Sequence, residues 1–226
     1  GTAWSSVPSN TASDLSSIYA PSTTDAWAAA WNGAMRRWDG TSWTAQADAP
    51  TGVYFVRGTG SADVWAVGNN GLVMHFDGGG WDTLDAGITR DLNAVWVASS
   101  SAAWIVGNGG NILRWDGTNW APETSPTTND LYTVAGTSPT DIWAGGFDYT
   151  LLHYDGTGWT EIDNGGPDIW AVFPVAGLGV WVTGEYGNTD FADGGANVDV
   201  QPPVRHGLSG HWGSSPNDLW IVGDDG

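Results

Sequence analysis

A set of short turns carries the side chains of this chain that are best suited to bind a ligand. Their plain form is Asn-Asn-Gly at 69–71, and four of the six copies add aromatic or acidic residues. The added residues are Trp31, Phe147, Asp148, Tyr149, Glu185, Tyr186, Asp224 and Asp225. Aromatic faces pack against the C–H face of a sugar, and carboxylates accept hydrogen bonds from its hydroxyls. The turns therefore predict a carbohydrate-binding surface; the alternative is solvated turns with incidental aromatics.

The sequence offers no convergent set of unlike residues that would indicate catalysis. Asp148, Glu185 and Asp224 could supply paired carboxylates for glycoside hydrolysis, but nothing in the sequence fixes their separation. The nucleophile-elbow, HExxH and phosphate-loop motifs are absent. We expect no enzyme activity, no catalytic residues, no metal and no cofactor. Calcium held between Asp148 and Glu185 is kept as an alternative, although the chain has no DxDxDG loop.

The charge excludes several classes of partner. The formal net charge is −19, and all six basic residues are Arg. Nucleic acid and anionic membranes both require a basic face, so neither is expected as a partner. No apolar run approaches the roughly 20 residues that span a bilayer, so we expect a soluble chain without membrane insertion. Asp outnumbers Glu by 22 to 3. This preference for Asp over Glu and for Arg over Lys is typical of secreted or cell-surface bacterial proteins, so we predict that location.

A repeat of tryptophans organises the whole chain. One column recurs every 38 or 39 residues and comprises Trp27, Trp65, Trp104, Trp143, Trp181 and Trp220. A second column with the same spacing comprises Trp4, Trp43, Trp81, Trp120 and Trp159, and its sixth position holds Asn197. Each unit contains four short apolar runs bounded by Gly, Ser, Asn or Asp, which predicts four antiparallel strands, A to D, joined by tight turns. This is the pattern of a propeller blade.

The fold prediction is an all-β, six-bladed β-propeller that occupies residues 1–226 as a single domain. The sixth blade takes strands A and B from the C-terminus and strand D from the N-terminus, around Trp4. It lacks its third strand, the counterpart of LVMHFD at 72–77. Three explanations remain open: the strand lies in flanking natural sequence, another chain donates it, or strands B and D pair directly.

Residues that recur in every unit are expected to build the blades. The two tryptophan columns should fill the space between sheets, with their indole N–H groups bonded at the rim. Asp-Gly pairs beginning at Asp39, Asp77, Asp116, Asp155 and Asp193 should form the C-to-D turns. Two further aspartate columns, Asp25, Asp63, Asp141, Asp218 and Asp14, Asp91, Asp130, Asp168, should serve other turns.

The C-to-D stretches RWDGTSW, HFDGGGW, RWDGTNW and HYDGTGW resemble shortened Asp-boxes, the turn motif of sialidase-type and other bacterial propellers. The unit as a whole is similar to repeats of secreted bacterial proteins, and more loosely to propeller lectins. In place of the usual Ser or Thr, this chain has Arg37, His75, Arg114 or His153. The resemblance implies architecture and does not imply sialidase activity.

The function prediction is a non-enzymatic extracellular binding module, most directly a lectin-like one that takes a glycan or cell-surface ligand on the face of the B-to-C and D-to-A loops. The alternative is a structural, adhesion or assembly component. In that alternative the propeller is a protein–protein scaffold, and a protein partner adds a strand at the incomplete sixth blade.

Overall fold

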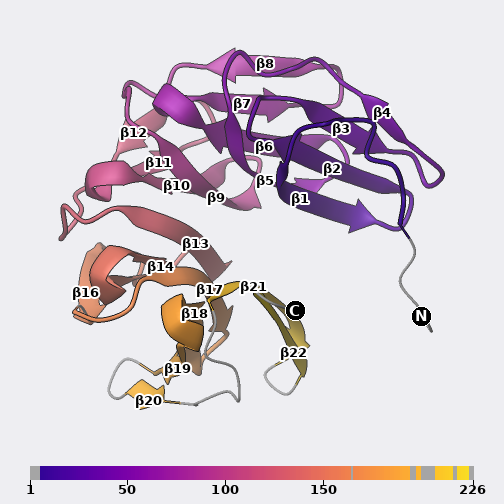
Figure 1. The fold of residues 1–226 in the computed structure, drawn as a ribbon. Helices are drawn as coiled ribbons and strands as arrows, with labels where there is room; N and C mark the ends of the chain where they lie inside the picture. The colour runs from indigo at the N-terminus through magenta and orange to yellow at the C-terminus, as the bar shows by residue number, and fades with distance from the viewer. Residues whose placement is uncertain (1–5, 164, 194–196, 200–206, 216–217, 224–226) are drawn as a thin grey trace. The chain divides into compact units, whose positions relative to one another are not determined.

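The computed structural model describes residues 6–163, 165–193, 197–199, 207–215 and 218–223 (Figure 1). Strands dominate it, and its helical elements are single 3-10 turns. The chain divides into two compact units, Gly1–Leu92 and Asn93–Gly226, which are described separately below. The single domain over 1–226 stays a prediction.

Unit 1 contains two four-stranded antiparallel sheets in which each strand pairs with the next along the chain. Their strands, drawn in indigo to magenta in Figure 1, are β1 (Leu15–Ser22), β2 (Asp25–Ala30), β3 (Met35–Trp38), β4 (Trp43–Ala45), β5 (Val53–Gly60), β6 (Asp63–Gly68), β7 (Val73–Phe76) and β8 (Trp81–Leu84).

Unit 2 repeats the same layout three times and ends in a two-stranded sheet, β21 (Leu208–Ser215) and β22 (Asp218–Gly223). The four-stranded sheets comprise β9 (Leu92–Ser99), β10 (Ala102–Gly107), β11 (Ile112–Trp115), β12 (Trp120–Pro122); β13 (Leu131–Ser138), β14 (Asp141–Gly146), β15 (Leu151–Tyr154), β16 (Trp159–Asp163); and β17 (Ile169–Val175), β18 (Gly179–Gly184), β19 (Thr189–Ala192), β20 (Asn197–Asp199).

The all-β prediction is confirmed, with five four-stranded sheets that have the strand order of propeller blades. The two-stranded β21–β22 sheet is consistent with a sixth blade that lacks its third strand among the described residues. Gly1–Ser5, including Trp4, lie outside the described residues, so the sharing of this blade between the two ends of the chain remains a prediction.

The B-strand tryptophans form the core, as predicted for the first four copies. Trp27, Trp65 and Trp104 are fully buried and Trp143 is 3 % exposed, whereas Trp220 is 67 % exposed. In unit 1 the Trp27 ring lies 4.7 Å from Phe76 and 5.2 Å from Trp81, centroid to centroid, so the first sheet packs its core tryptophan onto aromatic rings of the second.

The predicted Asp-Gly turn geometry is present between the C and D strands. The Oδ1 atom of Asp39 accepts the N–H groups of Thr41 and Ser42 at 2.8 and 2.9 Å, and the next residue, Gly40, has φ +95°. Bonds from the Thr41 hydroxyl and these N–H groups lower the pKa of Asp39 to about 2. Asp116 repeats the arrangement with Thr118 and Asn119.

The aspartates that begin the B strands were predicted to serve only the A-to-B turn. The structure corrects this, because they also bind side chains of the neighbouring strand. Asp63 accepts hydrogen bonds from Trp65 Nε1 at 3.1 Å and contacts His75 Nε2 at 2.8 Å. The His75 ring stacks on Trp65 with centroids 4.0 Å apart. The carboxylate thus joins strands B and C, a cross-strand contact that sequence spacing along one strand does not reveal.

The same cluster recurs at Asp141, Trp143 and His153, with hydrogen bonds of 3.1 and 3.0 Å. The third four-stranded sheet lacks it, because Ala102 stands at the aspartate position. Its Trp104 Nε1 is buried without a hydrogen-bond partner among the described residues. The expectation that every indole N–H would be bonded is therefore wrong at Trp104, and also at Trp27, where Asp25 instead binds Arg37.

Candidate functional site

Four of the B-to-C turns are single 3-10 turns whose middle residue has a left-handed backbone. They are η1 (Asn69–Gly71), η2 (Asn108–Gly110), η3 (Phe147–Tyr149) and η4 (Glu185–Gly187). The middle φ values are +56° at Asn70, +71° at Gly109, +54° at Asp148 and +57° at Tyr186. Gly, Asn and Asp adopt this conformation at little cost, whereas it is unfavourable for Tyr. The backbone of η4 at Tyr186 is therefore strained.

Aspartates that precede the A strand of the next blade bind three of these turns, η1, η2 and η3, with their side chains. The carboxylate of Asp130 accepts the N–H of Gly109 at 2.6 Å, and that of Asp168 accepts the N–H of Asp148 at 3.0 Å. The backbone oxygen of Asp168 also accepts the N–H of Glu185, at 3.0 Å. Asp168 therefore links η3 and η4, the two turns of unit 2 within the described residues that carry candidate residues.

The predicted ligand residues divide between the units. Trp31 belongs to unit 1, is 55 % exposed, and packs its ring 4.9 Å from that of Tyr54. Five residues belong to η3 and η4 of unit 2: Phe147, Asp148, Tyr149, Glu185 and Tyr186. Asp224 and Asp225 lie outside the described residues. The structure thus brings a subset of the predicted residues onto two neighbouring turns.

Phe147 and Tyr186 are the exposed aromatics of these turns, at 48 % and 71 %. The hydrogen bond and charge of Glu185 raise the pKa of Tyr186 above its ordinary value, which favours the neutral hydroxyl. Burial, followed by the charges of Asp168 and Asp130, raises the pKa of nearby Tyr132. The surface around η3 and η4 therefore combines aromatic rings, neutral hydroxyls and carboxylates.

Tyr149 differs from the other predicted residues because its ring is buried, with 6 % exposed. It packs with Ile169, Val172 and Leu151 in the core between two blades. Its hydroxyl donates a hydrogen bond to Asp190, and burial together with this carboxylate strongly raises its pKa. Tyr149 is thus an inward residue that reaches the next blade.

A surface pocket of about 280 Å³ opens beside this tyrosine. It is lined by Tyr149, Asp163, Gly165, Gly166, Pro167, Asn188 and Asp190. The N–H of Gly165 donates to the Asp148 carbonyl at 2.6 Å, which ties the D-to-A connection to η3. Sequence reasoning missed Asn188, Asp163 and Asp190. Asp190 carries a partial signal, because its column is apolar at Met74, Leu113 and Leu152 and holds Arg36 in the first sheet.

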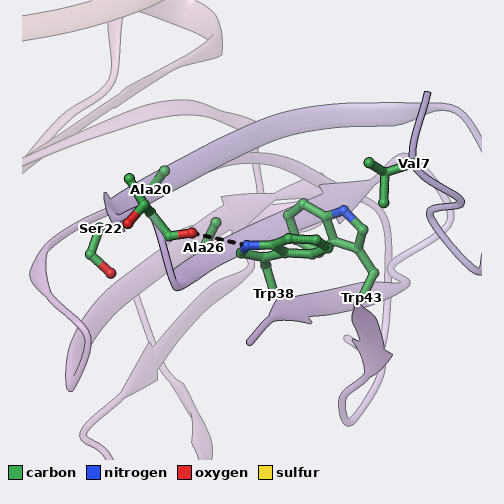
Figure 2. Close-up of a pocket in the computed structure, with 7 residues that line it drawn as sticks. Val7, Ala20, Ser22, Ala26, Trp38 and Trp43 are labelled. Carbon is green, nitrogen blue, oxygen red and sulfur yellow. Dashed lines mark hydrogen bonds between the residues drawn. The ribbon is translucent and has the colours of Figure 1, made fainter. Parts of the chain in front are cut away.

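A second pocket, also about 280 Å³, lies in unit 1 (Figure 2). It is at the end of the first sheet that carries the A-to-B and C-to-D turns, opposite the B-to-C turn. Trp38 and Trp43 line it with ring centroids 5.6 Å apart, and Trp38 Nε1 donates to the Thr23 carbonyl at 3.2 Å. Val7, Ala20 and Ala26 add apolar surface. It offers few polar groups to orient a ligand.

Within the described part of the chain, no group of three or more His, Cys, Asp or Glu side chains is placed to hold a metal ion. The same residues include no helix that is long and apolar enough to cross a membrane.

No family model matches this sequence, and no curated protein matches it. Solved structures do match. YCF48 from Cyanidioschyzon merolae aligns with a TM-score of 0.77 at 18% identity, over 98% of this chain and 83% of that chain. A structure described as YCF48 bound to D1 peptide aligns with a TM-score of 0.73 at 17% identity, over 93% of this chain and 74% of that chain.

The extracellular domain of a hybrid two component system, BT3049 from B. thetaiotaomicron, aligns with a TM-score of 0.76 at 13% identity. The alignment covers 97% of this chain and 33% of that chain. Together with the sheet layout, these likenesses show that the chain folds as a β-propeller. At such identities they establish the fold alone.

Proposed function

We propose that this protein is a non-enzymatic binding module that takes a carbohydrate on the B-to-C and D-to-A face of unit 2. The observation that carries the proposal is the placement of two exposed aromatic rings, Phe147 and Tyr186, on turns that one aspartate, Asp168, joins. Rings held on a rigid scaffold lose little entropy when they stack on a sugar, so such a pair is an effective platform.

The polar groups around the rings support the same ligand class. Asp148 and Glu185 accept hydrogen bonds, and the Tyr186 hydroxyl donates or accepts. Sugar hydroxyls do both, whereas a phosphate or sulfate would be repelled by these carboxylates and by the net charge of −19. The proposal therefore favours a neutral glycan over an anionic one.

A glycan array, repeated with and without calcium, tests this function. Phe147→Ala and Tyr186→Ala should each weaken binding about ten-fold, which corresponds to about 1.4 kcal/mol. Leu178→Ala is the matched control, because Leu178 is a 57 % exposed apolar residue of the same unit on an A-to-B turn, at the other end of its sheet. Wild-type protein that binds no glycan, or equal loss in all three variants, contradicts the proposal.

A protein segment is the second candidate ligand. Within the described residues, the β21–β22 sheet has two strands where the other five sheets have four, and Val222 on β22 is 65 % exposed. A neighbour of the same fold is described as bound to a peptide, and another is an extracellular domain. A synthetic peptide with the sequence LVMHFD tests strand addition: a raised Tm supports it, and an unchanged Tm argues against it.

The proposed location is extracellular, secreted or on a bacterial cell surface, where a glycan or partner protein would be met. The extracellular neighbour is compatible with this location. Calcium dependence of binding is decided by the array run in chelator.

A further inference from the structure

Trp31 is a predicted ligand residue that the proposed site in unit 2 does not use. It occupies the same place in the repeat as Phe147, directly after a B strand, since β2 ends at Ala30 and β14 ends at Gly146. The Trp31 side chain is 55 % exposed, compared with 48 % for Phe147. Aromatic side chains lose a large apolar area from water when a ligand stacks on them. Unit 1 therefore presents an aromatic ring at a position that the proposed function uses in unit 2.

Backbone contacts fix the turn that carries Trp31. Its N–H donates to the Asp14 carbonyl at 3.2 Å, and the Gly33 N–H donates to the Ala30 carbonyl at 2.9 Å. A Cβ atom at Gly52 would lie 2.3 Å from the Trp31 carbonyl oxygen. The connection from β4 to β5 thus approaches this turn too closely for a residue with a side chain. Because the backbone is already held, a ligand that stacks on the ring orders little else.

Tyr54, the second residue of β5, packs against the Trp31 ring. The two ring centroids are 4.9 Å apart and the ring planes are tilted by 59°. The Tyr54 hydroxyl bonds to the side-chain oxygen of Asn69 and to Asp91 Oδ2, the latter at 3.1 Å. Burial, followed by the bond and the charge of Asp91, raises the pKa of Tyr54. Tyr54 is half-buried and tethered at its hydroxyl, so it gives the more exposed Trp31 ring a fixed support.

Asn69 brings a hydrogen-bond donor close to this pair of rings. A Cβ atom at Gly52 would lie 2.9 Å from Asn69 Nδ2, in addition to its overlap with the Trp31 carbonyl, so the amide lies beside the turn of Trp31. The Tyr54 hydroxyl binds the oxygen of this amide. The NH₂ group, which carries two donor hydrogens, is the part of the Asn69 side chain that suits an acceptor on a ligand.

The polar groups of these two turns differ in charge from those of unit 2. The turns of unit 1 read Trp-Asn-Gly at 31–33 and Asn-Asn-Gly at 69–71, whereas η3 and η4 carry Asp148 and Glu185. The nearby Asp91 carboxylate binds the Asn70 N–H at 2.9 Å as well as Tyr54. Amides donate to and accept from sugar hydroxyls and acetamido groups without the desolvation of a charge. An indole face with amides beside it therefore suits a neutral pyranose and offers no turn carboxylate for calcium.

We infer that Trp31, Tyr54 and Asn69 form a second binding site for a neutral glycan, in unit 1, so that one chain holds two independent sites. The inference rests on the proposed carbohydrate-binding function and extends it to residues that the site in unit 2 does not contain. Trp31 is the stacking residue and Asn69 is the donor. Tyr54 is a positioning residue that supports the indole ring and holds the Asn69 side chain.

NMR titration of the full ¹⁵N-labelled chain separates the two sites. The probes are the methyl glycosides of glucose, galactose and N-acetylglucosamine, and the starting protein is the double variant Phe147→Ala/Tyr186→Ala. The Trp31 Nε1–H resonance, assigned by its loss in Trp31→Phe, should still shift with a glycoside that wild type binds. Addition of Trp31→Ala to the double variant should weaken the remaining binding by about ten-fold or more.

Two further variants show whether the loss is specific. Asn69→Asp keeps an acceptor for the Tyr54 hydroxyl and removes the NH₂ donor, so it should weaken binding in the double variant by about ten-fold. Val7→Ala is the matched control, because Val7 is a 49 % exposed apolar residue of the same unit and lines the pocket at the other end of the first sheet. Val7→Ala should leave binding and the Trp31 resonance unchanged, and a chelator should have no effect on this site.

The outcomes separate this inference from the proposed function. If wild type binds no glycoside, both fail. If wild type binds and the double variant does not, the site in unit 1 is overturned and the proposed function stands. Binding in the double variant that survives Trp31→Ala also overturns the site. If Trp31→Ala abolishes all binding while Phe147→Ala and Tyr186→Ala bind normally, the site in unit 1 holds and the proposed placement in unit 2 fails.

Discussion

Replacement of Asp168 by Ala should destabilise η3, the turn that carries Phe147. The loss in free energy can be worked out from the contacts of Asp168. The Asp168 carboxylate accepts the Asp148 N–H at 3.0 Å. A hydrogen bond to a charged group contributes about 1.5–3 kcal/mol when buried, and Asp168 is half-buried, so we assign it about 1–1.5 kcal/mol. The two left-handed residues that it restrains, Asp148 and Tyr149, cost about 1 kcal/mol each.

Because the bond and the backbone strain are similar in size, η3 should open readily in Asp168→Ala. Amide hydrogen exchange reports this directly: the Asp148 N–H should lose protection about ten-fold, since 1.4 kcal/mol is a factor of ten. The Tm should fall by about 2–6 °C for a protein of this length.

Asp130→Ala is the matched control for this prediction. It removes the same type of bond, from Gly109 at 2.6 Å, but η2 has glycines at both left-handed positions and stores no comparable strain. Its Tm should fall similarly while the Asp148 amide keeps its protection. Unchanged protection of the Asp148 amide in Asp168→Ala would refute the reasoning.

Three further predictions concern the scaffold. Ala102→Asp should stabilise the protein by about 1 kcal/mol in urea unfolding, because it gives the buried Trp104 Nε1 an acceptor; the gain should vanish in a Trp104→Phe background. For Asp141, burial would raise the pKa, but hydrogen bonds from Thr137, His153 and Trp143 outweigh it, so the pKa is lowered. The contribution of the Asp141 carboxylate to the free energy of unfolding is present above the unfolded-state pKa of about 3.9 and is lost as the pH falls through the lower pKa of the folded state. The difference in the free energy of unfolding between wild type and Asp141→Asn should therefore shrink below about pH 4. Gly110→Ala should destabilise by at least about 1 kcal/mol in the same assay, because its Cβ would overlap the Thr127 carbonyl oxygen and Gly110 has φ +71°.

The repeat made the fold predictable from sequence. The 38- or 39-residue spacing of Trp27, Trp65 and Trp104 locates each B strand, and all three are fully buried. The Asp-Gly turns were also predictable, because a carboxylate that caps N–H groups two and three residues ahead is a local interaction. Local chemistry that recurs in every unit is what a single sequence reveals best.

The candidate site was predictable only in part. The sequence indicates the exposed Phe147 and Tyr186, since they interrupt a plain turn. It does not reveal that Tyr149 points inward, because that direction depends on Asp190, 41 residues further along the chain. Asn188 carries no sequence signal, since Asn111 occupies the equivalent position and bonds its own turn there. Contacts between blades follow from the stacking of sheets, which the pattern within one repeat does not encode.

The aspartate that precedes four of the A strands, at Asp14, Asp91, Asp130 and Asp168, bears on how such a protein lengthens over evolution; Gly52 and Gly207 take its place ahead of β5 and β21. Asp130 bonds the turn of the preceding blade with its side chain and the turn of its own blade with its backbone oxygen. A duplicated unit therefore arrives with an aspartate for the turn before it and a turn ready for the aspartate after it. Duplication of the gene segment for such a unit adds a blade and keeps these aspartate–turn hydrogen bonds on both sides of it. A recombination event that separates the aspartate from the turn of the same unit would remove one of these bonds.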